Sequence, residues 1–304
     1  MELRGMVGHW HEAGGCGIQP GETRDMLQKL CRRLRWLPLW VALLLWPVLA
    51  QAGTMSTAYY TLDYGRWSGV ANALLPYLDA AFTTPAGILG YNNQGHGKID
   101  IFFYSDRGSD TLGYMYPGDN ALYLNLYGGN STGSGFLSDY GDTVAHETTH
   151  ILYYNKTGLA DRYDLTSPAM QSDIWVSESI AFYVGDVAYP RGPQENKSSI
   201  GAQLFSYSNG GAKRTTWYDS GLSYDNGSAS NLDYTQLDAI GLFLASYGDG
   251  RGLARLTDYL SHGNDYDAAF SSAYGKPSGQ FSTASGPGVN TLYSDYIQYY
   301  YGSY

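Results

Sequence analysis

Two histidines and one glutamate stand at a spacing that suits metal-assisted hydrolysis. The segment from residue 144 to 152 reads Val-Ala-His-Glu-Thr-Thr-His-Ile-Leu, so His146 and His150 are four positions apart and Glu147 follows the first of them. On an α-helix these two imidazoles share one face and can bind the same metal ion. Glu147 is offset from them, and its carboxylate can reach a metal-bound water without being a ligand. The segment therefore predicts a metal site with a general base beside it.

The third ligand decides which kind of metal site this is. No cysteine follows Cys31, so the structural zinc sites that rely on cysteine are excluded from the rest of the chain. Catalytic zinc sites use three protein ligands and leave one position for water. The longer form His-Glu-x-x-His-x-x-Gly-x-x-His is also excluded, because Tyr153 and Lys156 occupy its glycine and last histidine positions.

We predict that Glu178 is the third ligand. It lies 28 positions after His150, inside the largely apolar segment 174–184. A lone carboxylate in apolar surroundings is costly unless it is paired or bound to a metal. Only three glutamates but 21 aspartates follow residue 52, so a glutamate here is not readily explained as general surface charge. The alternative is a buried ion pair between Glu178 and an arginine such as Arg162.

The elements around these residues predict an α+β fold. The segments 98–104 and 121–127 have the alternating and apolar pattern of strands. A helix that carries His146 and His150 follows, with Asp139 or Asp142 as its N-cap, and the segment 174–184 is a second buried helix. We expect a small sheet to back the first metal helix.

The remaining pattern is mainly helical and gives no sign of a linker. We expect residues 53–304 to form one domain, with a sheet-containing subdomain at about 53–157 and a mainly helical one at about 158–304. The segment 190–232 is polar and irregular. The other predicted elements are a strand at 57–63, a helix at 69–82 with a kink at Pro76, a loop at 128–135, and helices at 234–247, 252–260 and 265–274.

The first 52 residues have the form of an export signal. Three arginines between positions 32 and 35 precede the apolar run 36–50, which is short for a membrane span, and Ala50-Gln51-Ala52 suits a cleavage site. We expect cleavage between residues 52 and 53 and secretion to an extracellular or periplasmic space, with Met26 as a candidate true start. An N-terminal membrane anchor is the alternative.

The chain after this leader is strongly acidic. The leader holds six of the 18 Lys/Arg and four of the 28 Asp/Glu, which leaves 12 basic and 24 acidic residues and a net charge of −12. Such a chain has no electrostatic reason to bind nucleic acid or an anionic membrane. Both cysteines lie in the leader, so no disulfide is expected afterwards. Aspartates are plentiful, so a Ca²⁺ site is possible, but none has EF-hand spacing and no Ca²⁺ site is assigned.

The two motifs together resemble a known group of enzymes. His-Glu-x-x-His followed by a helix of the form Trp-x-x-Glu-x-x-Ala is similar to the gluzincin metallopeptidases, and most of all to the hyicolysin-like secreted bacterial family. The segment 97–101, Gly113-Tyr114 and Asp119 resemble the upstream region of that family. The resemblance spans roughly residues 88–285 and implies a zincin-like fold. Thr148-Thr149 and the serines beside Glu178 differ from the residues usual in the family.

The resemblance implies a secreted zinc endopeptidase that acts on proteins or peptides. One Zn²⁺ on the three predicted ligands would lower the pKa of its bound water to about 7. Glu147 would take the proton of that water and pass it to the leaving amine. The family pattern points to Tyr234 as the donor that stabilises the oxyanion, with His262 as the second candidate. Because the chain has 30 tyrosines, ordinary packing is the competing interpretation of Tyr234.

Two other classes of function remain open from the sequence. One is a non-catalytic secreted surface or binding protein in which the metal is structural. The intact Glu147 argues against it, because a purely structural site needs no general base. The other is a zinc aminopeptidase, which would need an acidic site for the substrate amine, and no motif for such a site is evident.

Overall fold

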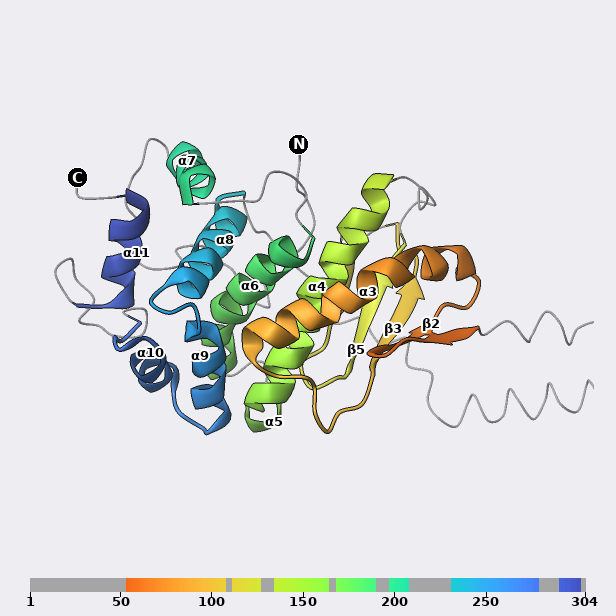
Figure 1. Ribbon diagram of the computed structural model, residues 1–304, viewed down its shortest axis with the longest axis horizontal. Coiled ribbons are helices and arrows are strands. Elements are labelled where there is room, and N and C mark those ends of the chain that lie inside the picture. Colours follow the sequence, from red (N-terminus) through yellow and green to blue (C-terminus); the bar gives the residue numbers. More distant parts are fainter. Residues whose placement is uncertain are drawn as a thin grey trace, which may run out of the picture.

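The computed structural model has an α+β fold with a small sheet and a mostly helical remainder (Figure 1). The sheet comes from the amino-terminal part of the chain, and helices form nearly all of the rest. Among the described residues, no helix combines the length and apolar character needed to cross a membrane. The predicted leader lies outside the described residues, which are 53–107, 111–126, 134–163, 168–189, 197–207, 231–278 and 290–301.

Five strands form one mixed sheet with the order β1-β2-β3-β5-β4. The three central strands run parallel, whereas β1 and β4 are antiparallel to their neighbours. Side chains alternate along β3, where Ile99, Ile101 and Phe103 are buried against the helices and Asp100 is exposed on the other face. The strands are β1 (Thr54–Ser56), β2 (Tyr60–Asp63), β3 (Ile99–Tyr104), β4 (Gly113–Met115) and β5 (Ala121–Asn125).

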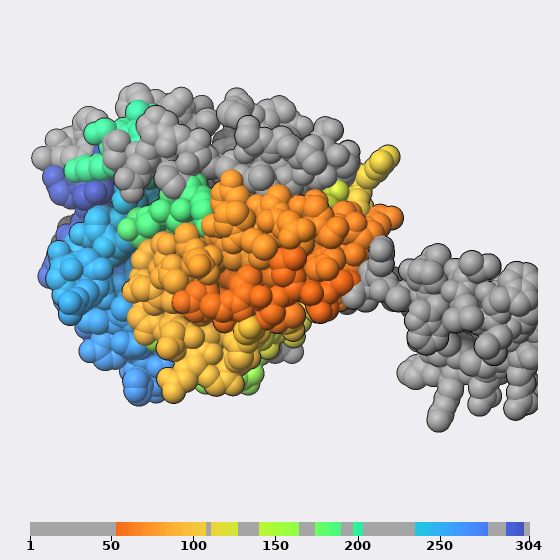
Figure 2. Space-filling view, turned by 45° about the vertical axis from the view of Figure 1, so that its right-hand side comes forward, coloured from red at the N-terminus to blue at the C-terminus, as the bar shows by residue number. Residues whose placement is uncertain are grey.

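Helices α3 and α4 lie between the sheet and the other helices (Figure 1). On the surface, the blue carboxyl-terminal helices lie at the left and the orange amino-terminal segments lie to their right (Figure 2). The helices are α3 (Ser68–Leu89), α4 (Ser134–Thr157), α5 (Leu159–Arg162), α6 (Pro168–Ala188), α7 (Lys197–Tyr207), α8 (Asn231–Ser246), α9 (Gly252–Ser261), α10 (Tyr266–Tyr274) and α11 (Leu292–Tyr301).

Helix α4 is the central helix of the fold. Every side chain from residue 140 to 154 is buried, polar ones included, because α3, α6, α9 and the sheet surround it. Buried polar groups need partners, and α4 finds them locally and on β2. Thr149 donates its hydroxyl to the Ala145 carbonyl at 2.7 Å, and the hydroxyls of Thr148 and Tyr60 are hydrogen-bonded at 2.8 Å.

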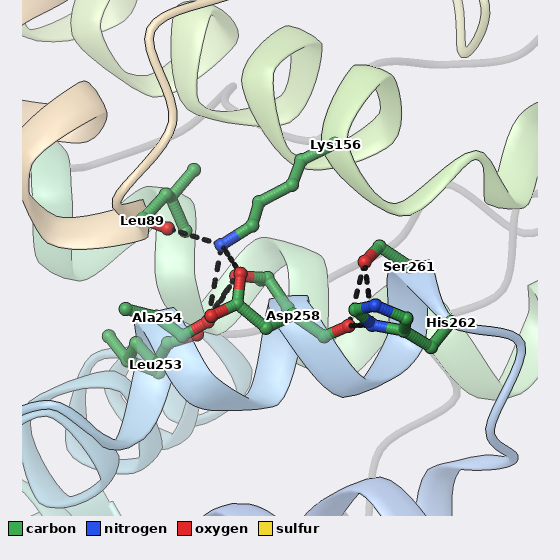
Figure 3. A network of polar contacts seen from close by, with 8 residues as sticks. Leu89, Lys156, Leu253, Ala254, Asp258, Ser261 and His262 are labelled. Atoms are coloured by element: carbon green, nitrogen blue, oxygen red, sulfur yellow. Dashed lines mark hydrogen bonds and ion pairs between the residues drawn. The ribbon is translucent and has the colours of Figure 1, made fainter.

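Lys156 fixes the carboxyl-terminal end of α4 (Figure 3). Its side chain is buried, and its Nζ donates to the carbonyl oxygens of Leu89 at 2.6 Å and Ala254 at 3.2 Å. The same Nζ lies 2.6 Å from Asp258 Oδ1. One ammonium group therefore joins the end of α4 to α9 and to the end of α3, where the last helix carbonyls favour a cation.

The predicted N-caps of α4 were wrong. The helix begins at Ser134, so Asp139 and Asp142 lie inside it rather than at its start. Asp142 is buried, and its carboxylate packs against Gly185 of α6, in a space that a larger residue at 185 would fill. The carboxylate that suggested a cap therefore belongs to the contact between the two helices.

Other boundaries also differ from the predictions. Helix α3 continues through Pro76 and Pro85 to Leu89, and α7 lies in the segment expected to be irregular. The edge strands β1 and β4, the short helix α5 and the tyrosine-rich α11 were not predicted. Of the loop predicted at 128–135, residues 128–133 lie outside the described residues, and the last two belong to α4. The strands at β3 and β5 and the helices α6, α8, α9 and α10 were predicted.

Candidate metal centre

Helices α4 and α6 bring the three predicted ligands together. The Nε2 atoms of His146 and His150 are 3.1 Å apart. His146 Nε2 lies 3.3 Å from Glu178 Oε2, and His150 Nε2 lies 3.5 Å from Glu178 Oε1. Both histidines are buried, and the Glu178 carboxylate is largely so. This group could hold a metal ion.

The spacing of these atoms suits a small tetrahedral ion. Nitrogen or oxygen atoms bound to one tetrahedral zinc at about 2.0–2.1 Å lie about 3.3–3.4 Å from each other. The three observed distances, from 3.1 to 3.5 Å, fall around that value. Three protein ligands also leave the fourth position of a tetrahedron for another group.

The charge state of Glu178 also suits a ligand. Burial alone would raise the pKa of this carboxyl group. The charge of His150 and the hydrogen bonds from His146 and His150 outweigh burial, and they hold the pKa well below its usual range. Glu178 is therefore ionised, as a metal-binding carboxylate must be.

Glu147 lies beside this group without belonging to it. Its side chain is buried, and within the described part of the chain its carboxylate forms no hydrogen bond or ion pair. Burial raises its pKa to about 7, against a smaller lowering by His146 and a further rise caused by Glu178. A carboxyl group with a pKa near 7 can both accept and donate a proton at neutral pH.

Two aromatic rings pack against the two imidazoles, and neither ring was predicted from the sequence. Phe182 of α6 packs edge-on against His146 with ring centroids 4.9 Å apart, and Tyr154 stacks over His150 at 6.5 Å. The Tyr154 hydroxyl lies 3.4 Å from the Ser177 hydroxyl, next to Glu178. Tyr154 and Phe182 each follow a ligand by four positions, so helical spacing could have revealed both.

Strand β4 crosses α4 close to Glu147. Gly113 packs directly on Thr143, since a Cβ at position 113 would lie 2.6 Å from Thr143 Cγ2. Thr143 precedes Glu147 by four positions and shares its face of α4. Strand β4 is at an edge of the sheet formed by the described strands, and it packs on α4 one helical turn before Glu147.

The structure describes the side chain of only one of the two predicted oxyanion donors. Tyr234 belongs to α8, but its side chain lies outside the described residues. His262 follows α9 and is exposed, and its Nδ1 donates to the Asp258 carbonyl oxygen at 2.6 Å (Figure 3). The described contacts of His262 do not include Glu147 or any of the three ligands.

The alternative ion pair between Glu178 and Arg162 is wrong. Arg162 donates through Nη2 to the carbonyl oxygens of Thr157 at 2.8 Å and Leu260 at 2.7 Å. Its guanidinium therefore joins α5 to α9, while Glu178 faces the two histidines.

No protein-family model matches the chain, and no curated protein matches it. The resemblance to the gluzincins therefore rests on the two short motifs that carry His146 and Glu178. The grouping of the three side chains is a property of the fold, and it does not depend on that resemblance.

Proposed function

We propose that this protein is a secreted zinc-dependent endopeptidase of the gluzincin type, with a zincin-like fold. The proposal rests mainly on the short distances, 3.1–3.5 Å, between the Nε2 atoms of His146 and His150 and the carboxylate oxygens of Glu178. The buried Glu147 follows His146 directly in the chain. Two imidazoles and one carboxylate are a frequent ligand set of catalytic zinc.

A catalytic role is supported by Glu147. A site that only stabilises the fold gains nothing from a second buried carboxylate, which costs free energy when it is ionised. A bound Zn²⁺ would polarise the scissile carbonyl and lower the pKa of the attacking water. Glu147 would accept a proton from that water and deliver it to the leaving amine, and His146, His150 and Glu178 would hold the ion between α4 and α6.

A polypeptide substrate is supported by the position of β4. An edge strand has unpaired backbone N–H and C=O groups that an extended peptide can bind as an additional strand. Gly113 of β4 packs on Thr143, which lies one helical turn before Glu147 on α4. A peptide aligned on β4 would therefore pass the general base.

Casein hydrolysis with and without chelator tests the proposal. The purified protein should cleave casein, lose this activity with 1,10-phenanthroline, and regain it when Zn²⁺ is added back. Internal cleavage would support an endopeptidase, whereas release of amino-terminal residues alone would assign an aminopeptidase. Hydrolysis that is insensitive to chelator, or no hydrolysis by folded and zinc-loaded protein, would reject the peptidase and leave a binding protein with a structural metal.

A further inference from the structure

The outer face of the sheet has a continuous group of aromatic rings. Phe102 and Tyr123 stack at 5.3 Å between centroids, and Tyr123 and Tyr114 stack at 4.9 Å. Tyr116 contacts both Tyr114 at 5.3 Å and Tyr123 at 5.9 Å, and Tyr104 meets Tyr114 edge-on at 5.7 Å. We call these five residues the aromatic face.

The register of the strands explains this arrangement. Phe102, Tyr123 and Tyr114 are cross-strand partners on β3, β5 and β4, so their rings lie in one row. They alternate with buried residues such as Leu122 and Leu124, and the aromatic face therefore points away from the helices. Its rings are partly exposed, and Tyr116 is 42% exposed.

Two exposed carboxylates, Asp100 and Asp119, lie near the aromatic face. Asp100 lies two residues before Phe102 on the same face of β3, and the Asp119 backbone N–H donates to the Tyr116 carbonyl oxygen at 2.9 Å. Burial raises the pKa of the Tyr123 hydroxyl, and the negative charges of Asp119 and Asp100 raise it further. Both aspartates are exposed, and neither forms an ion pair with another described residue. Lys98, at the start of β3, donates instead to Ser56 Oγ and the Thr57 carbonyl oxygen.

We propose that the aromatic face is a docking site for a Lys- or Arg-rich polypeptide segment, with a cationic group on Tyr116, the most exposed of the five rings. Tyr123 is stacked between Phe102 and Tyr114, so these neighbours cover its faces, whereas Tyr116 is exposed and lies edge to face with Tyr114 and Tyr123. A guanidinium or ammonium group is attracted to the negative potential over such an exposed ring. Asp100 and Asp119 add the complementary charge at the rim of the face. The aromatic face lies on the opposite face of the sheet from α4. Burial and, to a smaller extent, the charge of Glu147 still raise the pKa of Tyr104, so all binding is compared in one common Glu147→Gln background.

Fluorescence anisotropy of a labelled peptide of alternating Arg and Gly tests this site. The full chain carrying Glu147→Gln is used so that hydrolysis does not confuse the measurement. The Arg peptide should bind, and the same peptide with Gln in place of Arg should bind much more weakly. Each loss of a ring or a carboxylate should weaken binding about two- to fivefold, as expected for a partly exposed cation–π or charge contact.

Matched variants separate this site from the general acidity of the protein. Tyr116→Ser and Asp119→Asn should weaken binding of the Arg peptide. Tyr259→Ser, at a tyrosine of α9 that is 36% exposed, and Asp79→Asn, at an exposed aspartate of α3, should not. Equal losses in the control variants, or equal affinity for the Gln peptide, would overturn the proposal. Tyr116-dependent retention on an insoluble polysaccharide without Arg-peptide binding would also overturn it, in favour of a carbohydrate.

Discussion

The Nε2 atoms of His146 and His150 lie 3.1 Å apart, and both face the carboxylate of Glu178. Three groups that can bind a metal would not converge in this way merely to fill the core, because each is costly to bury alone. A shared ion satisfies all three at once, and the arrangement therefore makes predictions about metal content.

Removal of one ligand should abolish stable metal binding. We expect His150→Gln and Glu178→Gln to lower zinc affinity by more than about 100-fold, since even partners that only orient ligands are worth about 10–100-fold. Titration with a fluorescent zinc chelator measures this affinity. His262→Gln is the matched control, because His262 is exposed and bonded to Asp258, and it should keep full affinity. Unchanged affinity in the ligand variants would place the metal elsewhere.

The raised pKa of Glu147 predicts a pH-dependent effect on stability. Burial raises this pKa from 4.5 to about 7, so the folded chain holds the proton more tightly than the unfolded chain. The stability gained from protonated Glu147 is fully present below pH 4.5 and is lost as the pH rises through 7. Glu147→Gln should therefore stabilise the metal-free protein by about 1–3 kcal/mol near pH 8 and by little near pH 4.5.

Urea denaturation of chelator-treated protein at the two pH values measures this difference. Thr57→Ala, a substitution away from the centre, supplies a reference that should show no such pH dependence. An equal stabilisation by Glu147→Gln at both pH values would mean that the carboxyl group is not the titrating group.

The contact between Gly113 and Thr143 should control both stability and turnover. Gly113→Ala places a methyl group 2.6 Å from Thr143 Cγ2, so β4 must move away from α4. We expect a loss of about 1–3 kcal/mol in the free energy of unfolding and about a tenfold or greater loss in kcat/KM.

A second substitution can relieve this clash. Thr143→Ser keeps the hydroxyl and removes the offending methyl group, so the double variant should recover part of both losses. Gly87→Ala in α3 is the control, because the added Cβ meets no atom within 4 Å. Its stability should hold or rise by up to about 1 kcal/mol. A double variant no better than Gly113→Ala would contradict the assigned contact.

The hydrogen bond between Tyr60 and Thr148 should anchor α4 to β2. Both residues are fully buried, so Tyr60→Phe leaves the Thr148 hydroxyl without this partner. We expect the free energy of unfolding to fall by about 1–2 kcal/mol, measured by urea denaturation, with zinc content unchanged. Tyr259→Phe, at an exposed ring, should have no measurable effect. Equal stability of the two variants would show that this bond does not anchor the helix.

The grouping of His146, His150 and Glu178 could be predicted from the sequence, because their spacing is local or carries a chemical signature. His146 and His150 are related by one helical turn, and Glu178 stood out as a carboxylate in an apolar segment. The start of α4 could not be predicted in the same way. From residue 140 to residue 154 this helix is buried on all sides, so that stretch lacks the one-sided apolar stripe that marks a surface helix.

Tertiary contacts explain the other differences. Strand β4 has only three residues and is defined by its pairing with β5, which no local pattern specifies. The position of Gly113 on Thr143 likewise depends on how the sheet packs on α4. The aromatic face could not be recognised in a sequence with 30 tyrosines, because only the strand register shows which rings are neighbours.

The most direct test of the central claim combines zinc content and peptide hydrolysis for Glu147→Gln. The account predicts about one zinc per chain in both the unsubstituted protein and the variant, because Glu147 is not a ligand. It also predicts that casein hydrolysis by the variant falls by about 100-fold or more, as expected for loss of a general base. A zinc-loaded Glu147→Gln protein that hydrolyses casein at the original rate would contradict the account.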